Sequence, residues 1–356
     1  MSLDSHRPDP PEKGITYAEA GVDIGAANTT KQRIKSLLRS TFGPEVLSDV
    51  GAFAGLFQAK WGDYEDPVLV SSVDGVGTKL KVAFMMGKHD TVGIDLVSHC
   101  VNDILVYGAQ PLFFMDYIAM TRHSGEVILE VVSGIARACK DVGCTLLGGE
   151  MAEMPGFYNE GEYDLIGMVV GLVDRKGIID GSRISPGDVI LGLASNGLHT
   201  NGYSLARKLF FDHAGWDVNT YIDPLGCTIG EELMKPHRCY ARPVLELLRS
   251  LPVHGIVHIT GGGFQDNIPR ILPPDRRAHI RLGSWDIPPV FTLLQKTGKI
   301  SDEEMFHTFN MGIGMLLILP PENTERAEKL LIEHGEKVFG IGEISEGTRE
   351  VSFDQK

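Results

Sequence analysis

Short apolar runs alternate with amphipathic stretches through the first half of the chain. Short apolar runs bounded by Gly, Pro or Asp are typical of buried strands. We predict strands over residues 67–72, 112–119, 144–147 and 163–173. Apolar residues spaced three and four apart predict helices over residues 95–107 and 125–142, the second ending at Gly143. This order of elements predicts an α/β or α+β layer.

The second half repeats the alternation after a segment of different composition. Charged residues, Gly and Pro accumulate over residues 174–188, as in a connection between domains. Beyond it we predict strands over residues 189–194, 315–319 and 337–342 and helices over residues 204–211 and 242–250. We therefore predict two domains, residues 15–175 and 176–350, after a disordered N-terminus at residues 1–14.

Composition and charge exclude several classes of protein. The chain has 356 residues, 43% of them hydrophobic, and a formal net charge of −14. This apolar content argues against a disordered chain, and the charge argues against a protein that binds duplex nucleic acid. A small phosphorylated substrate remains compatible, because local Lys, glycine amides and metal ions bind phosphate within acidic proteins.

Cysteine usage and hydropathy indicate the compartment. The five cysteines are odd in number and form no Cys-X-X-Cys pair, so we expect free thiols in a reducing cytosol. No apolar run approaches the ~18–20 residues that span a bilayer, and the N-terminus lacks the apolar core of a signal peptide. We expect a soluble, cytoplasmic protein that binds no membrane.

The helix predicted over residues 95–107 divides into two faces. Its apolar residues form one stripe, whereas Asp95, His99, Asn102 and Asp103 line another side. A solvated polar face is the simpler interpretation. Against it, the polar residues are short and partly acidic, and Asp suits a helix interior poorly. Short carboxylates along one face are what a Mg²⁺–phosphate site requires.

Two glycine motifs follow predicted strands in the first half. One runs from Asp74 through two glycines to Thr78 and Lys79; the other is Gly148-Gly149-Glu150. Glycines let backbone N–H groups approach phosphate oxygens, although Asp-Gly is also a common turn pair. If the two strands are neighbours, Asp74, Glu150 and Asp103 would gather into an acidic cluster. Such a cluster favours a divalent cation, because like charges repel without one.

Two polar loops in the second half also follow apolar strands. The first, residues 195–204, offers Asn, His, Thr and Ser side chains, including His199 and Asn201. The second, Thr260–Phe264, contains three consecutive glycines that would cradle a phosphate. A lone histidine is usually structural and a triple glycine usually a loop, but both motifs occur here directly after a strand.

Together these motifs resemble the phosphoribosylformylglycinamidine cyclo-ligases, or aminoimidazole ribonucleotide synthetases, of purine biosynthesis. The resemblance runs from about Tyr17 to Ile344. The matching segments are YAEAGVDI at 17–24, DGVGTKLK at 74–81, DTVGIDLVSHCVNDI at 90–104, GAQPLFFMDY at 108–117, GGEMAEMPGFY at 148–158, IDGS at 179–182, GLHTNGYSL at 197–205, TGGGFQDNIPR at 260–270 and TFNMGIGM at 308–315.

The resemblance implies a reaction and an architecture. ATP phosphorylates the formyl amide oxygen of formylglycinamidine ribonucleotide, and a nitrogen of the same molecule then closes the imidazole ring. The products are 5-aminoimidazole ribonucleotide, ADP and phosphate. The implied fold is an N-terminal α/β domain whose sheet forms a barrel across a homodimer, with a C-terminal α/β domain packed against it. The nucleotide site would lie near the dimer interface.

The resemblance also implies roles for individual residues. Asp74 and Asp103 would hold Mg²⁺, whereas a third metal-binding Asp of some relatives falls near His258. We assign catalytic roles to Lys35, Asp103 and His199. The positions expected to bind ATP are Lys35, Val73, Asp74, Gly75, Gly77, Thr78, Lys79, Asp95, Gly148, Gly149 and Glu150. Those expected to bind the substrate are His199, Asn201, Gly261, Gly262 and Gly263.

Other enzymes on the same scaffold are the first alternatives. A selenophosphate synthetase would need a Cys or selenocysteine near the N-terminus, but the first Cys is Cys100. A thiamine-phosphate kinase-like phosphotransferase is not expected to carry both GLHTNGYSL and TGGGFQDNIPR. The late domain of formylglycinamidine synthetase would belong to a far longer chain. A non-catalytic nucleotide-binding protein is a further alternative, against which Lys35, Asp74 and Asp103 count.

Overall fold

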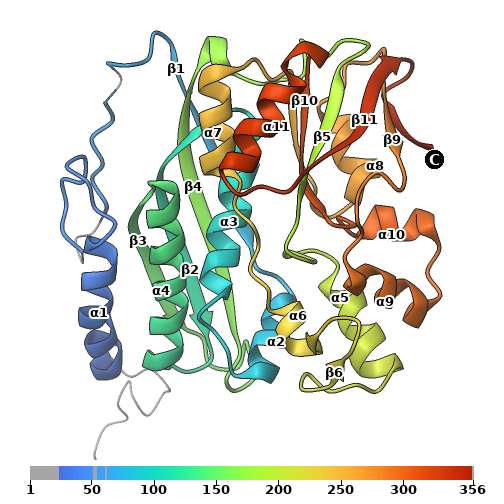
Figure 1. Ribbon diagram of the computed structural model, residues 1–356. Helices are drawn as coiled ribbons and strands as arrows, with labels where there is room; N and C mark the ends of the chain where they lie inside the picture. Colours follow the sequence, from blue (N-terminus) through green and yellow to red (C-terminus); the bar gives the residue numbers. More distant parts are fainter. Residues whose placement is uncertain (1–23, 51–53, 61, 355–356) are drawn as a thin grey trace, which may run out of the picture.

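A computed structural model describes residues 24–50, 54–60 and 62–354, which form two sheets with helices packed on them (Figure 1). The disordered segment predicted for residues 1–14 lies outside the described residues. The first sheet has four strands and the second has six; a small two-stranded pair joins Tyr221–Ile222 (β6) to Cys227–Thr228 (β7).

The four-stranded sheet has the order β1-β4-β2-β3 and is curled (Figure 1). Its strands are Pro67–Gly75 (β1), Gln110–Met120 (β2), Thr145–Glu153 (β3) and Tyr163–Asp174 (β4). Strand β4 pairs antiparallel with β1 and β2, and β2 pairs parallel with β3. The four helices of this half are Ile24–Arg39 (α1), Lys79–Met86 (α2), Val92–Leu105 (α3) and Gly125–Val142 (α4).

Helices α3 and α4 cover one face of this sheet, and α1 packs on α4 and β3 (Figure 1). Two glycines allow α3 and α4 to approach closely. A Cβ on Gly93 would lie 2.2 Å from the carbonyl oxygen of Val131, and one on Gly134 would lie 2.7 Å from that of Asp90. On the opposite face, Leu69, Val73 and Ile166 are exposed.

The six-stranded sheet has the order β12-β9-β11-β5-β10-β8. Its strands are Val189–Ala194 (β5), Gly255–His258 (β8), Arg276–Arg281 (β9), Ile313–Leu319 (β10), Val338–Glu346 (β11) and Glu350–Asp354 (β12). Every residue of β10 is buried, as its unbroken apolar run predicts. The helices of this half are Tyr203–Arg207 (α5), Ile229–Leu233 (α6), Ala241–Ser250 (α7), Gly263–Asn267 (α8), Pro289–Gly298 (α9), Asp302–Thr308 (α10) and Thr324–Glu333 (α11).

The two halves meet along α3. This helix contacts α7 and β8 of the second half, and α2 contacts α6. Figure 1 accordingly shows α3 between the four-stranded sheet and the C-terminal half. The polar face of α3 therefore lies at the interface between the two halves. We call this interface, with the polar residues Asp74, Asp95, Asp103, His199 and His258, the seam. It contains the carboxylates of α3 that the sequence predicts to be functional.

Most predicted elements are confirmed, although several bounds differ. The strand predicted over residues 337–342 is Val338–Glu346, and the helix predicted over residues 95–107 is Val92–Leu105. Strand β3 continues through Gly148 and Gly149 to Glu153, because the whole segment pairs with β2; the motif lies inside a strand instead of after it. The helix predicted over residues 204–211 is a short α-helix, α5, followed by a π-helical turn at Lys208–His213. All five cysteines are free, as expected. No helix among the described residues is long and apolar enough to cross a membrane.

Candidate active site between the two domains

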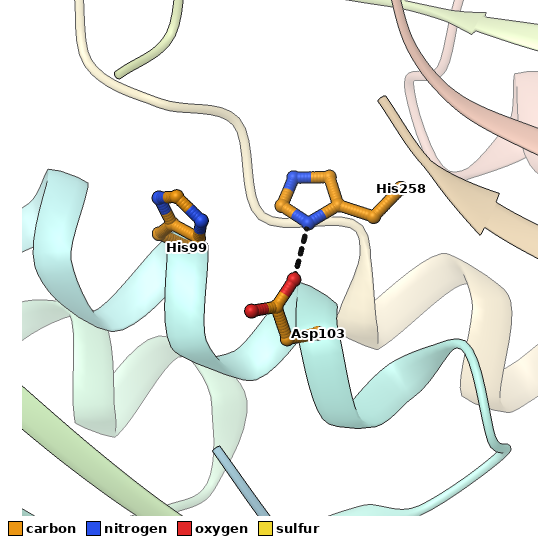
Figure 2. Close-up of side chains that lie close together, drawn as sticks. All are labelled: His99, Asp103 and His258. Carbon is orange, nitrogen blue, oxygen red and sulfur yellow. Dashed lines mark hydrogen bonds and ion pairs between the residues drawn. The ribbon is translucent and has the colours of Figure 1, made fainter. Parts of the chain in front are cut away.

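Asp103 of α3 connects the two halves through His258. Its Oδ1 lies 2.9 Å from Nδ1 of His258, at the end of β8, and its Oδ2 accepts a hydrogen bond from the Ser72 hydroxyl at 3.1 Å. Figure 2 shows the His258 ring facing Asp103. Burial opposes ionisation of Asp103, but the hydrogen bonds from His258 and Ser72, together with the charge of His99, outweigh it and lower the pKa of this carboxyl group. Asp103 is therefore an anion at neutral pH.

Asp74 lies on β1 beside the same face of α3. Its Oδ2 is 2.9 Å from Nε2 of His99, and its Oδ1 accepts the N–H of Gly75 at 2.7 Å. Partial burial raises the pKa of Asp74, but the hydrogen bond and charge of His99 and the hydrogen bond from the Gly75 N–H together outweigh this effect, so the net shift is downward. The same pairing raises the pKa of His99 despite its burial. The structure thus brings Asp74 and Asp103 to one seam, each with a histidine partner.

Four imidazole rings fill the space behind these carboxylates. His237 stacks on His199 with ring centroids 4.1 Å apart, and its Nε2 lies 3.1 Å from Nε2 of His258. The Thr200 hydroxyl bridges His99 Nδ1 at 2.8 Å and His237 Nδ1 at 3.2 Å. Burial lowers the pKa of His199, His237 and His258, so these three rings are neutral. A continuous hydrogen-bonded network therefore links α3 to the C-terminal half.

His199 has an unusual backbone within this network. Its φ is +62°, the left-handed region that few residues with a side chain adopt. Its ring is buried, Nε2 accepts the N–H of Asn196 at 3.1 Å, and Nδ1 has no partner among the described residues. The strained backbone and the unpartnered nitrogen mark this loop as a candidate for function, which agrees with the sequence prediction.

Lys79 and Asp95 lie deeper in the seam than the sequence suggests. Neither side chain is exposed, and Lys79 Nζ lies 2.8 Å from Asp95 Oδ1. The ammonium group also donates to the carbonyl oxygens of Lys235, at 2.7 Å, and His199, at 3.3 Å. The three N–H groups of this lysine are thus directed at protein acceptors. A contact of Lys79 or Asp95 with ATP stays a prediction.

The glycine turn after β1 lies at the mouth of the seam. Gly77 has a φ of +67° and space for a Cβ on all sides. The adjacent Thr78 is exposed, and its hydroxyl lies 3.1 Å from that of Ser204 in the C-terminal half. This turn lies directly after Asp74, so Gly75, Gly77 and Thr78 share the edge of the seam that carries the first candidate metal ligand.

The triple glycine and Asn201 lie together. A Cβ on Gly261 would lie 3.4 Å from Oδ1 of Asn201, whose buried Nδ2 has no partner among the described residues. Gly262 and Gly263 have φ values of +90° and +55°, and a Cβ on Gly263 would lie 1.9 Å from the carbonyl oxygen of Phe306. The third glycine of the loop, Gly263, is therefore required. The unpartnered Nδ2 group of Asn201 is a donor available to a ligand.

Gly148, Gly149 and Glu150 do not join this cluster. Strands β1 and β3 are opposite edges of the sheet, with β4 and β2 between them. The register aligns Asp74 with Gly149 across three strand spacings, or about 14 Å at ~4.8 Å per spacing. Glu150 shares its row with exposed Ile166 and so lies on the face opposite α3. We expected a cluster of Asp74, Asp103 and Glu150 only if the two strands that carry Asp74 and Glu150 were neighbours. These strands, β1 and β3, are not neighbours, so the cluster is not formed.

Lys35 and the side chain of Val73 are also separate from the carboxylate pair. Val73 is exposed on the uncovered face of the sheet. Lys35 is a half-buried residue of α1, and α4 separates α1 from α3 (Figure 1). Within one chain, the structure does not bring Lys35 to Asp103. ATP binding by Val73, Gly148, Gly149, Glu150 and Lys35 stays a prediction.

Sequence reasoning missed His237 and the bridging role of Thr200. His237 lies between α6 and α7, in a segment where no motif was identified. Its N–H donates to Asp95 Oδ1 at 2.7 Å, and Asn102 donates to the neighbouring carbonyl of Arg238 at 2.8 Å. The one signal in the sequence was the polar face of α3, which needed polar partners from elsewhere in the chain.

The fold and the seam define the class of protein. Residues 56–173 match the family described as AIR synthase related protein, N-terminal domain, and residues 185–355 match AIR synthase related protein, C-terminal domain. A thiamine-monophosphate kinase from Stenotrophomonas maltophilia has a TM-score of 0.66 at 17% identity, over 91% of this chain and 95% of that chain. A hydrogenase maturation protein HypE in complex with ATP has a TM-score of 0.66 at 18% identity, over 91% of each chain. These structures share the mixed α/β two-domain fold.

Curated relatives identify the family within this class. Phosphoribosylformylglycinamidine cyclo-ligase of Syntrophotalea carbinolica is 53% identical over 95% of this chain and 97% of the relative. The enzyme of the same name from Alkaliphilus metalliredigens is 49% identical over 96% of this chain and 99% of the relative. The chain belongs to the phosphoribosylformylglycinamidine cyclo-ligase family, and the resemblance found in its motifs is confirmed.

Proposed function

We propose that this chain closes the imidazole ring of 5-aminoimidazole ribonucleotide. ATP phosphorylates the formyl amide oxygen of formylglycinamidine ribonucleotide to an iminophosphate, and an amidine-side nitrogen of the same molecule displaces phosphate. The observation that supports this function is the seam itself, in which Asp74 and Asp103 meet the His199–Asn201 loop and the triple glycine. Family membership gives the reaction, and the seam supplies groups that suit phosphate chemistry.

The carboxylates of Asp74 and Asp103 fit a magnesium ion. Both have lowered pKa values and offer the hard oxygen ligands that Mg²⁺ prefers. Each oxygen accepts one hydrogen bond, which leaves a lone pair for coordination. When bound, Mg²⁺ neutralises charge on the transferring phosphoryl group. Hydrogen bonds from His99 to Asp74 and from His258 to Asp103 would hold the two carboxylates in place.

The glycine turn and the buried ion pair have separate tasks in this proposal. The backbone of half-buried Gly75 and of exposed Gly77 and Thr78, next to Asp74, would contact ATP phosphates. Lys79 and Asp95 would instead fix the angle between the turn and the C-terminal half, because both are fully buried. In this arrangement the glycine turn would contact the nucleotide, and the buried Lys79–Asp95 pair would hold the turn in position.

The second-half loops are suited to the ribonucleotide. We assign the substrate phosphate to the backbone of Gly261–Gly263 and the orientation of the substrate to Asn201, whose Nδ2 is buried and unpartnered. Burial keeps His199 neutral, so it would act through hydrogen bonding and packing. Ring closure is intramolecular once the amide is activated, so positioning supplies much of the rate enhancement.

A coupled assay tests the function. Purified protein with ATP, Mg²⁺ and formylglycinamidine ribonucleotide should form a Bratton–Marshall-reactive aminoimidazole and an equal amount of ADP. Omission of the ribonucleotide should abolish ADP release, and substitution of thiamine phosphate should not restore it. Substrate-independent ADP release, or phosphorylation of thiamine phosphate, would refute the proposal. The thiamine kinase resemblance shows the fold alone at 17% identity, so it does not favour that alternative.

We propose that two chains pair through the uncovered face of the four-stranded sheet, completing a barrel. Leu69, Val73 and Ile166 are exposed on this face, and apolar side chains in such numbers on one sheet face are typical of an interface. A homodimer would also bring the motif at Gly148–Glu150 near a second chain. We also propose domain limits of residues 15–175 and 176–350. A cytoplasmic location is proposed as well, because a reducing compartment suits the five free cysteines.

A further inference from the structure

The seam contains a mixed set of nitrogen and oxygen donors that includes one residue of the proposed magnesium pair. His99, Asp103 and His258 each offer one ligand atom, and the three atoms lie within 4.8 Å of one another. His99 and Asp103 are one helical turn apart on α3, and His258 approaches from the end of β8 (Figure 2). Two imidazoles and one carboxylate converge here, although Mg²⁺ takes oxygen ligands almost exclusively.

The distances are close to those of a metal site. Bonds of about 2.0–2.2 Å to a tetrahedral ion place the ligand atoms about 3.3–3.6 Å apart. The observed separations are within 4.8 Å, and Asp103 Oδ1 lies 2.9 Å from His258 Nδ1, so the distances between ligand atoms would change by up to about 1.5 Å when an ion enters. His99 and Asp103 share the i, i+4 spacing by which helices present two ligands to one ion.

Each imidazole is already oriented by a second partner. His99 Nδ1 is held by the Thr200 hydroxyl at 2.8 Å, which directs Nε2 toward the carboxylates. His258 Nε2 is held by His237 at 3.1 Å, which directs Nδ1 toward Asp103. In both rings one nitrogen is fixed by a protein partner, as in histidines that ligate a metal. The other nitrogen now donates to a carboxylate, and its proton would leave when an ion binds.

Burial adds selectivity to this geometry. The side chains of His99 and His258 are 7% and 3% exposed, whereas Asp103 is 30% exposed and faces the opening. An ion bound here would be enclosed on the imidazole side and keep open positions beside Asp103. Imidazole nitrogen favours zinc and its neighbours over magnesium.

We propose that His99, Asp103 and His258 form a binding site for a divalent transition-metal ion of the zinc class. The site is distinct in its donors from the magnesium pair Asp74–Asp103 but shares Asp103 with it. The inference goes beyond the proposed ring closure, because the ion binds with neither ATP nor ribonucleotide present. Three protein ligands and open positions are the form of a zinc site that also accepts a water or an anionic ligand.

Titration with Co²⁺, a visible-absorbing substitute for Zn²⁺, tests the proposal on the full chain without nucleotide. One equivalent of Co²⁺ should produce ligand-field bands, and Zn²⁺ should abolish them at a similar concentration. An equal concentration of Mg²⁺ should leave them unchanged. Absence of these bands, or displacement of Co²⁺ by equimolar Mg²⁺, would overturn the proposal. Because the measurement involves no turnover, it stands or falls separately from the cyclo-ligase assay.

Variants locate the ion. His99→Gln and His258→Gln should each weaken Co²⁺ binding at least tenfold, whereas His334→Gln, at an exposed histidine directly after α11, should leave it unchanged. Circular dichroism of each variant establishes that it is folded. Should buried His258→Gln fail to fold, His99→Gln carries the test. Equal affinity in His99→Gln and the unaltered chain would show that the ion binds elsewhere and would refute the site.

Discussion

Lys79 and Asp95 form an ion pair with an Nζ–Oδ1 distance of 2.8 Å and with no exposure of either side chain. The lysine also donates to two backbone carbonyl groups of the C-terminal half. Three acceptors match the three N–H groups of an ammonium ion. The pair therefore fastens the N-terminal half, which supplies both charges, to the loops that carry His199 and Lys235.

Lys79→Met should destabilise the protein strongly. Removal of one member of a buried pair leaves an uncompensated charge, which costs about 3–5 kcal/mol. Urea denaturation measures the loss, and Lys81→Met, which removes a partly exposed pair with Glu162, is the control with little expected change. An unchanged free energy of unfolding together with weaker ATP binding would instead show that Lys79 contacts the nucleotide.

Asp103→Asn should abolish turnover and preserve the fold. The substitution removes the negative charge proposed to hold Mg²⁺ but keeps the size of the side chain, so we expect kcat to fall at least a hundredfold. Steady-state kinetics at several Mg²⁺ concentrations, with thermal unfolding alongside, checks this. Asp286→Asn, an exposed position paired with Lys337, serves as control. If the Asp103 variant were unfolded, its role would be structural.

Two glycines of one loop should respond differently to alanine. In Gly263→Ala, a Cβ meets the Phe306 carbonyl at 1.9 Å, and the left-handed backbone alone costs about 1–3 kcal/mol. Gly261→Ala places its Cβ 3.4 Å from Asn201 and should fold normally but raise KM for the ribonucleotide. Denaturation and kinetics of both variants separate the two effects. An unaltered KM in Gly261→Ala would argue against the phosphate assignment.

Acid should destabilise the protein through its buried neutral histidines. Burial lowers the pKa of His89, His199 and His237. Below pH ~6.5 these histidines therefore bind protons in the unfolded chain but not in the folded chain. As the pH is lowered, the free energy of unfolding decreases by up to ~1.4 kcal/mol per pH unit for each such histidine. His89→Gln should reduce this slope and His334→Gln should not. Urea denaturation between pH 5 and pH 8 measures it, and equal slopes would contradict the prediction.

Charge placed on the uncovered sheet face should dissociate the proposed dimer. Leu69→Lys introduces an ammonium group at a side chain that is 57% exposed in the single chain. Ile332→Lys on α11, at 59% exposure, is a matched control away from the sheet. Sedimentation equilibrium should give a monomer for the first variant and a dimer for the second. A dimer in both would place the interface on another surface.

Helix α4 shows what could be predicted from the sequence. Its apolar residues repeat with helical spacing, and Gly143, with a φ of +71°, ends it in the left-handed conformation that glycine favours. Both signals are local, so the predicted limits 125–142 match the structure. Strand β5 at Val189–Ala194 matches for the same reason, since its apolar run is bounded by polar residues.

The parts that could not be predicted depend on pairing between distant segments. Strand β3 passes through two glycines because β2 pairs with it along its whole length, which no local signal conveys. Likewise, Asp74 and Glu150 each follow an apolar run, but the strand order places them on opposite edges. His237 had no motif around it, because its importance comes from stacking on His199. The sequence thus indicated the chemistry of α3 but not its partners.

The division of the ligand groups between α3 and β8 has a consequence for proteolysis. Asp103 and His258 come from opposite sides of the segment 174–188, so a cut there would leave each fragment with an incomplete set of groups. The proposed ligand set would then be complete only while the two fragments stayed associated through the contacts of α3 with α7 and β8. Damage at this segment is therefore expected to weaken the proposed site through dissociation of the fragments, although every residue of the site is still present.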